Sequence, residues 1–94
     1  MNDDYLDFQH RAQRKALLIA LHHGATISRS RNVKDAPFTV RVKNEQGIVP
    51  AGLVHELSQE GILRKQDYPH QFFYTLSARG AQVAREANNV TAWL

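Results

Sequence analysis

Residues 61–80 read GILRKQDYPHQFFYTLSARG, and this stretch decides the fold. Two short apolar-rich runs flank the polar turn DYPH, which predicts antiparallel strands over 62–66 and 71–76. Ser77 is a favourable N-cap residue, so the second strand is predicted to lead directly into a helix over 78–88. The stretch therefore predicts a hairpin with a basic rim that runs straight into a helix.

The block 53–84 resembles the C-terminal half of winged-helix proteins. In those families a helix ends at a glycine, a strand of hydrophobic and basic residues follows, and a turn leads to a strand that ends Tyr-x-Leu-Ser/Thr-x-x-Gly. Here Gly61 ends the helix, residues 62–65 are the hydrophobic and basic run, and residues 74–80 complete the motif. The resemblance implies a winged-helix-like fold in which the hairpin is the wing.

A long first helix is predicted over 3–23, where apolar residues recur at spacings of three and four. Gly24 supplies the left-handed residue that ends it. The predicted inward residues are Tyr5, Phe8, Ala12, Ala16, Ile19 and Ala20, with Leu17, Leu18 and Leu21 broadening the stripe.

Between the first helix and residue 53, the spacing of apolar residues changes from the helical pattern to the alternation of β-strands. Strands are predicted over 26–33 and 38–42, joined by the turn-forming KDAP and closed by NEQG. Phe38, Val40 and Val42 are expected to face the core, while the other face carries basic side chains. A short helix is predicted over 50–60, with Leu53, Val54 and Leu57 inward.

These elements predict an α+β fold, a winged-helix-like single domain over 1–88 with a C-terminal tail over 89–94. The predicted order is helix, β-hairpin, helix, β-hairpin (the wing), helix. Small winged-helix-like bacterial toxins that inhibit topoisomerase I resemble this order more closely than standard winged-helix proteins do. That second resemblance implies a protein target rather than DNA.

Positive charge is concentrated in one third of the chain. Residues 1–10 sum to −3, residues 11–43 to +7 and residues 44–94 to −1. Such a local excess indicates a polyanion or an acidic protein surface as partner. The predicted binding residues are Arg29, Arg31, Lys34, Arg41, Lys43, Arg64, Lys65, Tyr68 and His70.

The short helix over 50–60 is predicted to be a poor reader of the DNA major groove. It contains no Lys or Arg, and Glu56 and Glu60 are expected to face the phosphates. The hairpin cations and the wing are therefore expected to make the contacts. The alternative for these cations is a solvated strand face that prevents aggregation.

Several classes of function are disfavoured. The chain has no cysteine, and its five histidines lack paired metal-ligand spacing, so neither a metal nor another cofactor is predicted. There is no phosphate loop, nucleophile motif or carboxylate pair, so an enzyme is not expected. The longest apolar run is too short to span a membrane and the N-terminus is acidic, which predicts a cytoplasmic protein without a membrane partner.

The sequence thus predicts a small non-enzymatic module that engages DNA, or a nucleic-acid-handling complex, through the basic hairpin and the wing. The alternative is a protein inhibitor, of toxin or phage-defence type, that binds a nucleic-acid enzyme directly. A homodimer formed through the first helix or the tail is a third alternative.

Overall fold

The computed structural model describes residues 3–92 of the chain, and the side chains of residues 9–89. Five antiparallel strands form one sheet in the order β3-β2-β1-β5-β4. The elements are α1 (Asp3–His22), β1 (Thr26–Ser30), β2 (Phe38–Val42), β3 (Glu45–Val49), α2 (Ala51–Gln59), β4 (Leu63–Asp67), β5 (Gln71–Leu76) and α3 (Ala78–Ala92). The chain is therefore a small α+β domain.

The strand β3 is absent from the sequence-based prediction and changes the order of elements. Residues 44–47 were expected only to close the first hairpin, but residues 45–49 pair with β2 along its whole length. Lys43 adopts a left-handed φ of 53° and forms the two-residue turn with Asn44. The order is thus helix, three strands, helix, hairpin, helix. The prediction was wrong because EQGIV contains a glycine and has apolar residues only at its end, which is a weak strand pattern.

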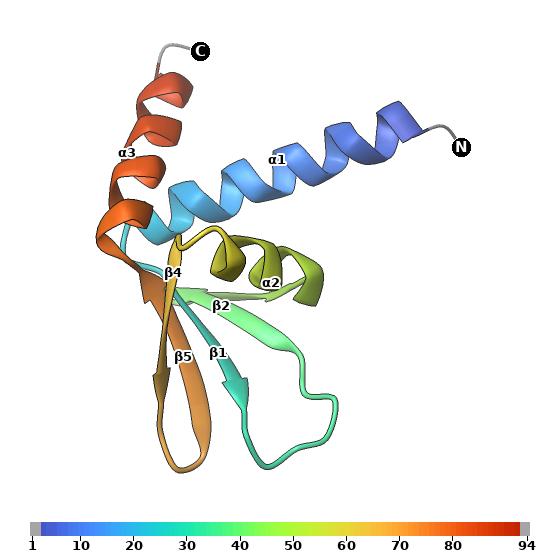
Figure 1. Ribbon diagram of the computed structural model, residues 1–94, viewed down its shortest axis with the longest axis vertical. Helices are drawn as coiled ribbons and strands as arrows, with labels where there is room; N and C mark the ends of the chain where they lie inside the picture. The colour runs from blue at the N-terminus through green and yellow to red at the C-terminus, as the bar shows by residue number, and fades with distance from the viewer. Residues whose placement is uncertain (1–2, 93–94) are drawn as a thin grey trace.

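The core lies on one face of the sheet. Strand alternation places Ile27, Phe38, Val49 and Leu63 on the same side, and all four are buried. In Figure 1 the helices gather at one end of the sheet: α1 crosses it, α2 lies in front of the strands and α3 rises beyond β5. The β4–β5 turn and the β1–β2 connection project together from the opposite end. This end is therefore free of helices.

The buried stripe of α1 is rotated relative to the predicted one. Leu17, Leu18 and Leu21 are buried, whereas Ala12 and Ala16 are exposed. The larger leucine side chains bury more apolar area than alanines, so they determine which side of the helix faces the sheet. Tyr5 and Phe8, also predicted to point inward, lie outside the residues whose side chains are described.

The junction from the hairpin into α3 confirms the predicted local chemistry. Gly61 has a φ of 76° and ends α2, and the N–H of Ile62 donates to the Leu57 carbonyl at 2.9 Å. Ser77 caps α3, because its Oγ accepts the Gly80 N–H at 2.9 Å. Gly80 is itself buried. The hairpin and α3 are therefore held together through backbone contacts.

Two details of α3 differ from the prediction. The helix continues to Ala92 rather than ending at residue 88, so the first residues of the predicted tail are helical. Ala81 was expected to point inward but is exposed, whereas Ala84 is buried and Ala87 packs against the core. Trp93, which was assigned to the tail, lies outside the described residues.

Candidate functional site

Three of the predicted cations meet on the helix-covered face of the sheet. Arg29 lies two positions after the buried Ile27 on β1, so both side chains point to the same face. Arg31 extends this row just beyond the strand. Lys65 on β4 pairs with Tyr74, which packs against the core from that face. We call Arg29, Arg31 and Lys65 the basic floor.

Aromatic rings hold the basic floor in place. The Arg31 guanidinium carbon lies 4.6 Å from the centre of the Phe72 ring, and Lys65 Nζ lies 4.0 Å from the same centre. Arg29 lies 5.1 Å from the centre of the Phe38 ring. Cation–π contacts restrict these long side chains while leaving their charges accessible. The cations are therefore partly preorganised on the sheet.

One carboxylate lies among these cations. Asp67 accepts a hydrogen bond from Arg31 at 3.0 Å and lies 3.8 Å from Lys65 Nζ. Three positive groups against one carboxylate leave a net charge of +2. The Arg31 and Lys65 side chains are 41% and 47% exposed, so both remain able to contact an anion.

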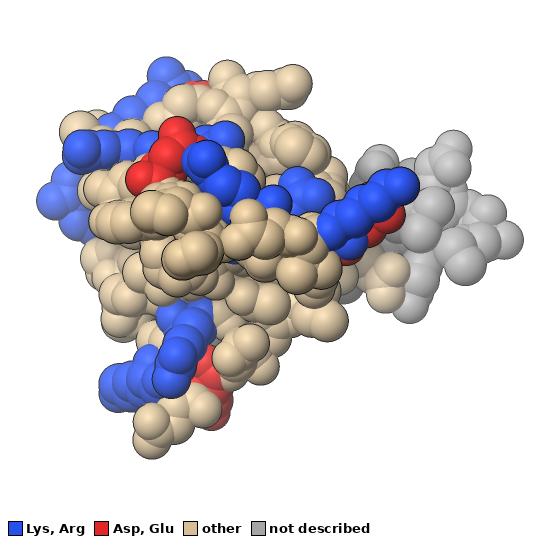
Figure 2. All heavy atoms as spheres, turned by 90° about the horizontal axis from the view of Figure 1, so that it is seen from below, with Lys and Arg blue, Asp and Glu red and all other residues tan. Residues whose placement is uncertain are grey.

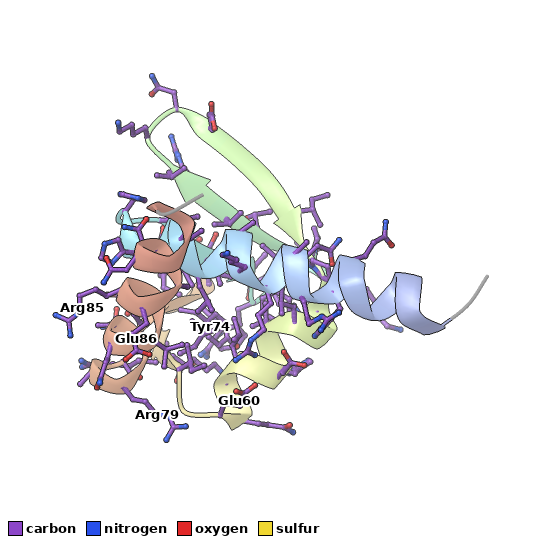
Figure 3. The ribbon with its side chains drawn as sticks, turned by 90° about the horizontal axis from the view of Figure 1, so that it is seen from above. Glu60, Tyr74, Arg79, Arg85 and Glu86 are labelled. Carbon is purple, nitrogen blue, oxygen red and sulfur yellow. The ribbon has the colours of Figure 1, made fainter. Side chains whose placement is uncertain are left out.

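Tyr74 adds a neutral donor beside the basic floor. Its ring packs edge-on against Phe38 at 5.6 Å, and Figure 3 shows it near the centre of the molecule, between α3 and α2. Burial raises the pKa of the Tyr74 phenol; Arg29 opposes this shift and Asp67 adds to it. The phenol therefore keeps its proton at neutral pH and can donate a hydrogen bond.

A groove continues from the basic floor to α2. It has a volume of about 460 Å³ and runs between the β1–β2 connection and the start of α2. Arg29 lines it from the sheet and His55 lines it from the helix. The His55 ring packs edge-on against Phe38 at 6.0 Å, the same ring that Arg29 covers. The sheet and α2 therefore present one continuous surface.

The carboxylates of α2 face α1, not the solvent side of the helix. Arg14 Nη1 donates to Glu56 at 2.7 Å and to Glu60 at 2.8 Å, and its Nη2 donates to Glu60 at 2.9 Å. His10 Nε2 lies 2.9 Å from Glu56 Oε1. Ion pairs with α1 therefore orient both glutamates toward that helix, and Arg14 compensates one of their two negative charges (Glu60 is labelled in Figure 3).

This ion-pair cluster predicts a dependence of stability on pH. The hydrogen bond from Arg14, and then that from His10, lowers the pKa of Glu56 in the folded state. Because the pKa of Glu56 is lower in the folded than in the unfolded state, its carboxylate stabilises the fold at pH values above the unfolded-state pKa. This stabilisation is lost as the pH falls through the folded-state pKa. We expect the free energy of unfolding to fall less between about pH 5 and pH 3 for Glu56→Gln than for the wild type, since the variant has no carboxylate to protonate at this position. Urea unfolding at both pH values measures this; equal losses would show that the pair contributes nothing.

The residues at the β4–β5 turn have different roles. Tyr68 is 48% exposed and packs edge-on against Phe73 at 5.2 Å, on the face away from the basic floor. His70 joins the β4–β5 turn to the β1–β2 connection, because Asn32 Nδ2 donates to His70 Nδ1 at 3.2 Å and the Arg31 N–H donates to the His70 carbonyl at 2.9 Å. His70 is thus mainly a structural link, while Tyr68 is available for contact.

The remaining predicted cations lie elsewhere. Arg41 and Arg64 alternate to the face opposite the basic floor, and Lys34 is exposed in the β1–β2 connection. Lys43 lies in the β2–β3 turn, where it lines a hollow with His23 at the end of α1. Figure 2 looks onto the helix-free end and shows Lys and Arg in separate groups, with Asp and Glu among them. The cations therefore do not form the single ridge that the sequence predicts.

The sequence analysis missed four residues of this surface: His55, Asp67, Phe72 and Tyr74. A usable signal was the alternation from Ile27 to Arg29, which places that arginine on the core side of β1. The contact between His55 and Phe38 has no local signal, because it depends on where α2 packs on the sheet.

Comparisons with known protein families, with curated proteins and with solved structures found no match to this chain. Within residues 3–92, no helix is long and apolar enough to cross a membrane. The same part of the chain contains no group of three or more His, Cys, Asp or Glu side chains that could hold a metal ion.

Proposed function

We propose that this protein is a small binding module without enzymatic activity that engages duplex DNA through the basic floor, the groove and the exposed side of α2. The observation that carries the proposal is the basic floor itself: three cations held against aromatic rings on one face of the sheet. Phosphate contacts of this kind supply affinity and fix the position of the protein on the duplex.

The topology around the site supports the proposal. β1, β5 and β4 are neighbours in the sheet, α2 comes immediately before β4, and the β4–β5 hairpin leads into α3. A hairpin between two helices is where a winged-helix-like domain carries its wing, so in this proposal β4–β5 acts as the wing; the three strands before α2 differ from the usual order. The β2–β3 hairpin would then replace the first helix of the usual helix-turn-helix.

The exposed side of α2 also supports DNA as the ligand. His55, Ser58 and Gln59 are exposed, and each can hydrogen-bond to base edges without bringing a negative charge. Because Arg14 holds both glutamates toward α1 and compensates one of their charges, the repulsion expected from the sequence is reduced on this side of the helix.

Salt dependence tests the proposal directly. Affinity for duplex DNA should fall with ionic strength at a log–log slope of roughly −0.9 per phosphate contacted. With about three to five contacts, a fourfold rise in salt should weaken binding on the order of a hundredfold. Fluorescence anisotropy with a labelled duplex measures this. An absence of binding at low salt would overturn the DNA proposal.

That negative result would favour the alternative of a protein inhibitor that docks on a nucleic-acid enzyme. The same net-positive basic floor fits an acidic protein surface, since charge complementarity steers protein association as well. Capture of partners from a lysate before and after nuclease treatment separates the two, because partners bound through DNA are lost when the DNA is digested.

A further inference from the structure

The two edges of the sheet differ in their protection. β3 and β4 are the edge strands. β4 carries three charged residues, Arg64, Lys65 and Asp67, whereas β3 carries only Glu45. Charged side chains on an edge strand oppose pairing with another chain, so β4 is protected against such pairing and β3 is not.

An exposed apolar residue and an apolar groove lie at this unprotected edge. Ile48 on β3 is 75% exposed. Beside it a groove of about 260 Å³ runs between β3 and α1, and its lining is apolar apart from Gln13. Ala16 and Ala20 form its α1 side, where their small side chains leave room for a partner. Figure 3 shows the β2–β3 hairpin along one outer side of the molecule.

We propose that two copies of this chain pair through β3, antiparallel and related by a two-fold axis near Gly47. This register places Gln46 opposite the partner's Ile48 and Glu45 opposite the partner's Val49. No like charges then face each other, and the partner's strand covers the edge side of each Ile48. A symmetric dimer of this kind is self-complementary and extends the sheet across the axis.

Charge complementarity favours a second copy over an unrelated strand. Glu45 and Val49 alternate to the same face of β3, so in this register Glu45 lies opposite the partner's Val49, two residues before the start of α2. The first turn of α2 carries no acidic residue, and Pro50 at its N-cap makes no side-chain hydrogen bond there among the described residues. A carboxylate is favourable at such a helix start. In the symmetric dimer this contact occurs twice, because the Glu45 carboxylate of each copy lies near the start of the partner's α2.

Sedimentation velocity over a wide range of protein concentration tests the dimer. We expect the wild type to shift from monomer to dimer as concentration rises, and Ile48→Lys to raise the midpoint of this shift at least about tenfold, because two ammonium groups would lie near the axis. The matched control is Val33→Lys at an exposed valine in the β1–β2 connection, which should dimerise like the wild type.

Hydrogen exchange provides a second measurement that does not depend on a variant. Backbone amides of residues 45–49 should gain protection as concentration rises, while those of the other edge, residues 63–67, should not change. The proposal is overturned if the wild type stays monomeric up to near-millimolar concentration. It is equally overturned if Ile48→Lys dimerises at the wild-type midpoint or if the gain in protection appears at residues 63–67.

Discussion

Replacing the three cations of the basic floor together, Arg29→Gln, Arg31→Gln and Lys65→Gln, is expected to weaken duplex binding by a hundredfold or more. Each replacement removes one positive charge but keeps a long side chain over the aromatic ring. If each cation contacts one phosphate, the log–log salt slope should become shallower by roughly 2.7. Anisotropy titrations at several salt concentrations measure both the affinity and the slope.

The control removes the same charge from other surfaces. Arg41→Gln, Lys43→Gln and Arg64→Gln also subtract three positive charges, but none of these residues belongs to the basic floor. We expect the control to lose less than about tenfold in affinity, through the long-range field alone. Equal losses in the two triple variants would mean that net charge, and not the floor, determines binding.

The largest expected effect on stability is that of Gly80→Ala. A Cβ at this position would overlap the Ile62 carbonyl oxygen and lie 2.9 Å from its carbonyl carbon. That carbonyl also accepts the Ser77 N–H, so a displacement would disturb the cap of α3. Because backbone must move, we expect a loss of about 3 kcal/mol or more in the free energy of unfolding. For a domain of this size that corresponds to a fall in Tm of roughly 12–24 °C.

Gly52→Ala is the matched control for this variant. Gly52 also lies in a helix, but a Cβ there meets nothing within 4 Å. Alanine is the better helix former, so this replacement should leave Tm unchanged or raise it. Thermal unfolding followed by circular dichroism compares the two. A Gly80→Ala protein as stable as Gly52→Ala would show that α3 does not approach the chain at Ile62 as closely as described.

The parts of the fold that local chemistry determines were predictable. Gly61 as a left-handed stop and Ser77 as a helix cap each depend on neighbours within a few residues. The two apolar-rich runs around DYPH form the predicted hairpin, as Leu63–Asp67 and Gln71–Leu76. By contrast, the sequence of β3 has only a weak preference for strand structure. The strand forms because it pairs with β2 along its whole length.

The candidate site was less predictable, because its geometry depends on distant partners. The buried residues Leu53, Val54 and Leu57 set which side of α2 faces the core. Whether Glu56 and Glu60 meet a cation depends on Arg14, on a helix far earlier in the chain. The meeting of Arg31 with Lys65 requires β1 and β4 to flank β5. The sequence identified the cations as binding candidates but could not say which of them share a face.

The central position of β1 has a consequence for how the chain folds. β1 pairs with β2, its neighbour in sequence, and with β5, so that Ile27 faces both Val40 and Tyr74. The β1–β2–β3 meander and the β4–β5 hairpin are each local, but joining them closes a long loop, which carries an entropic cost. We therefore expect docking of β5 on β1 to limit the folding rate. During synthesis, the inner edge of β1 would stay open to other chains until the ribosome has released residue 76.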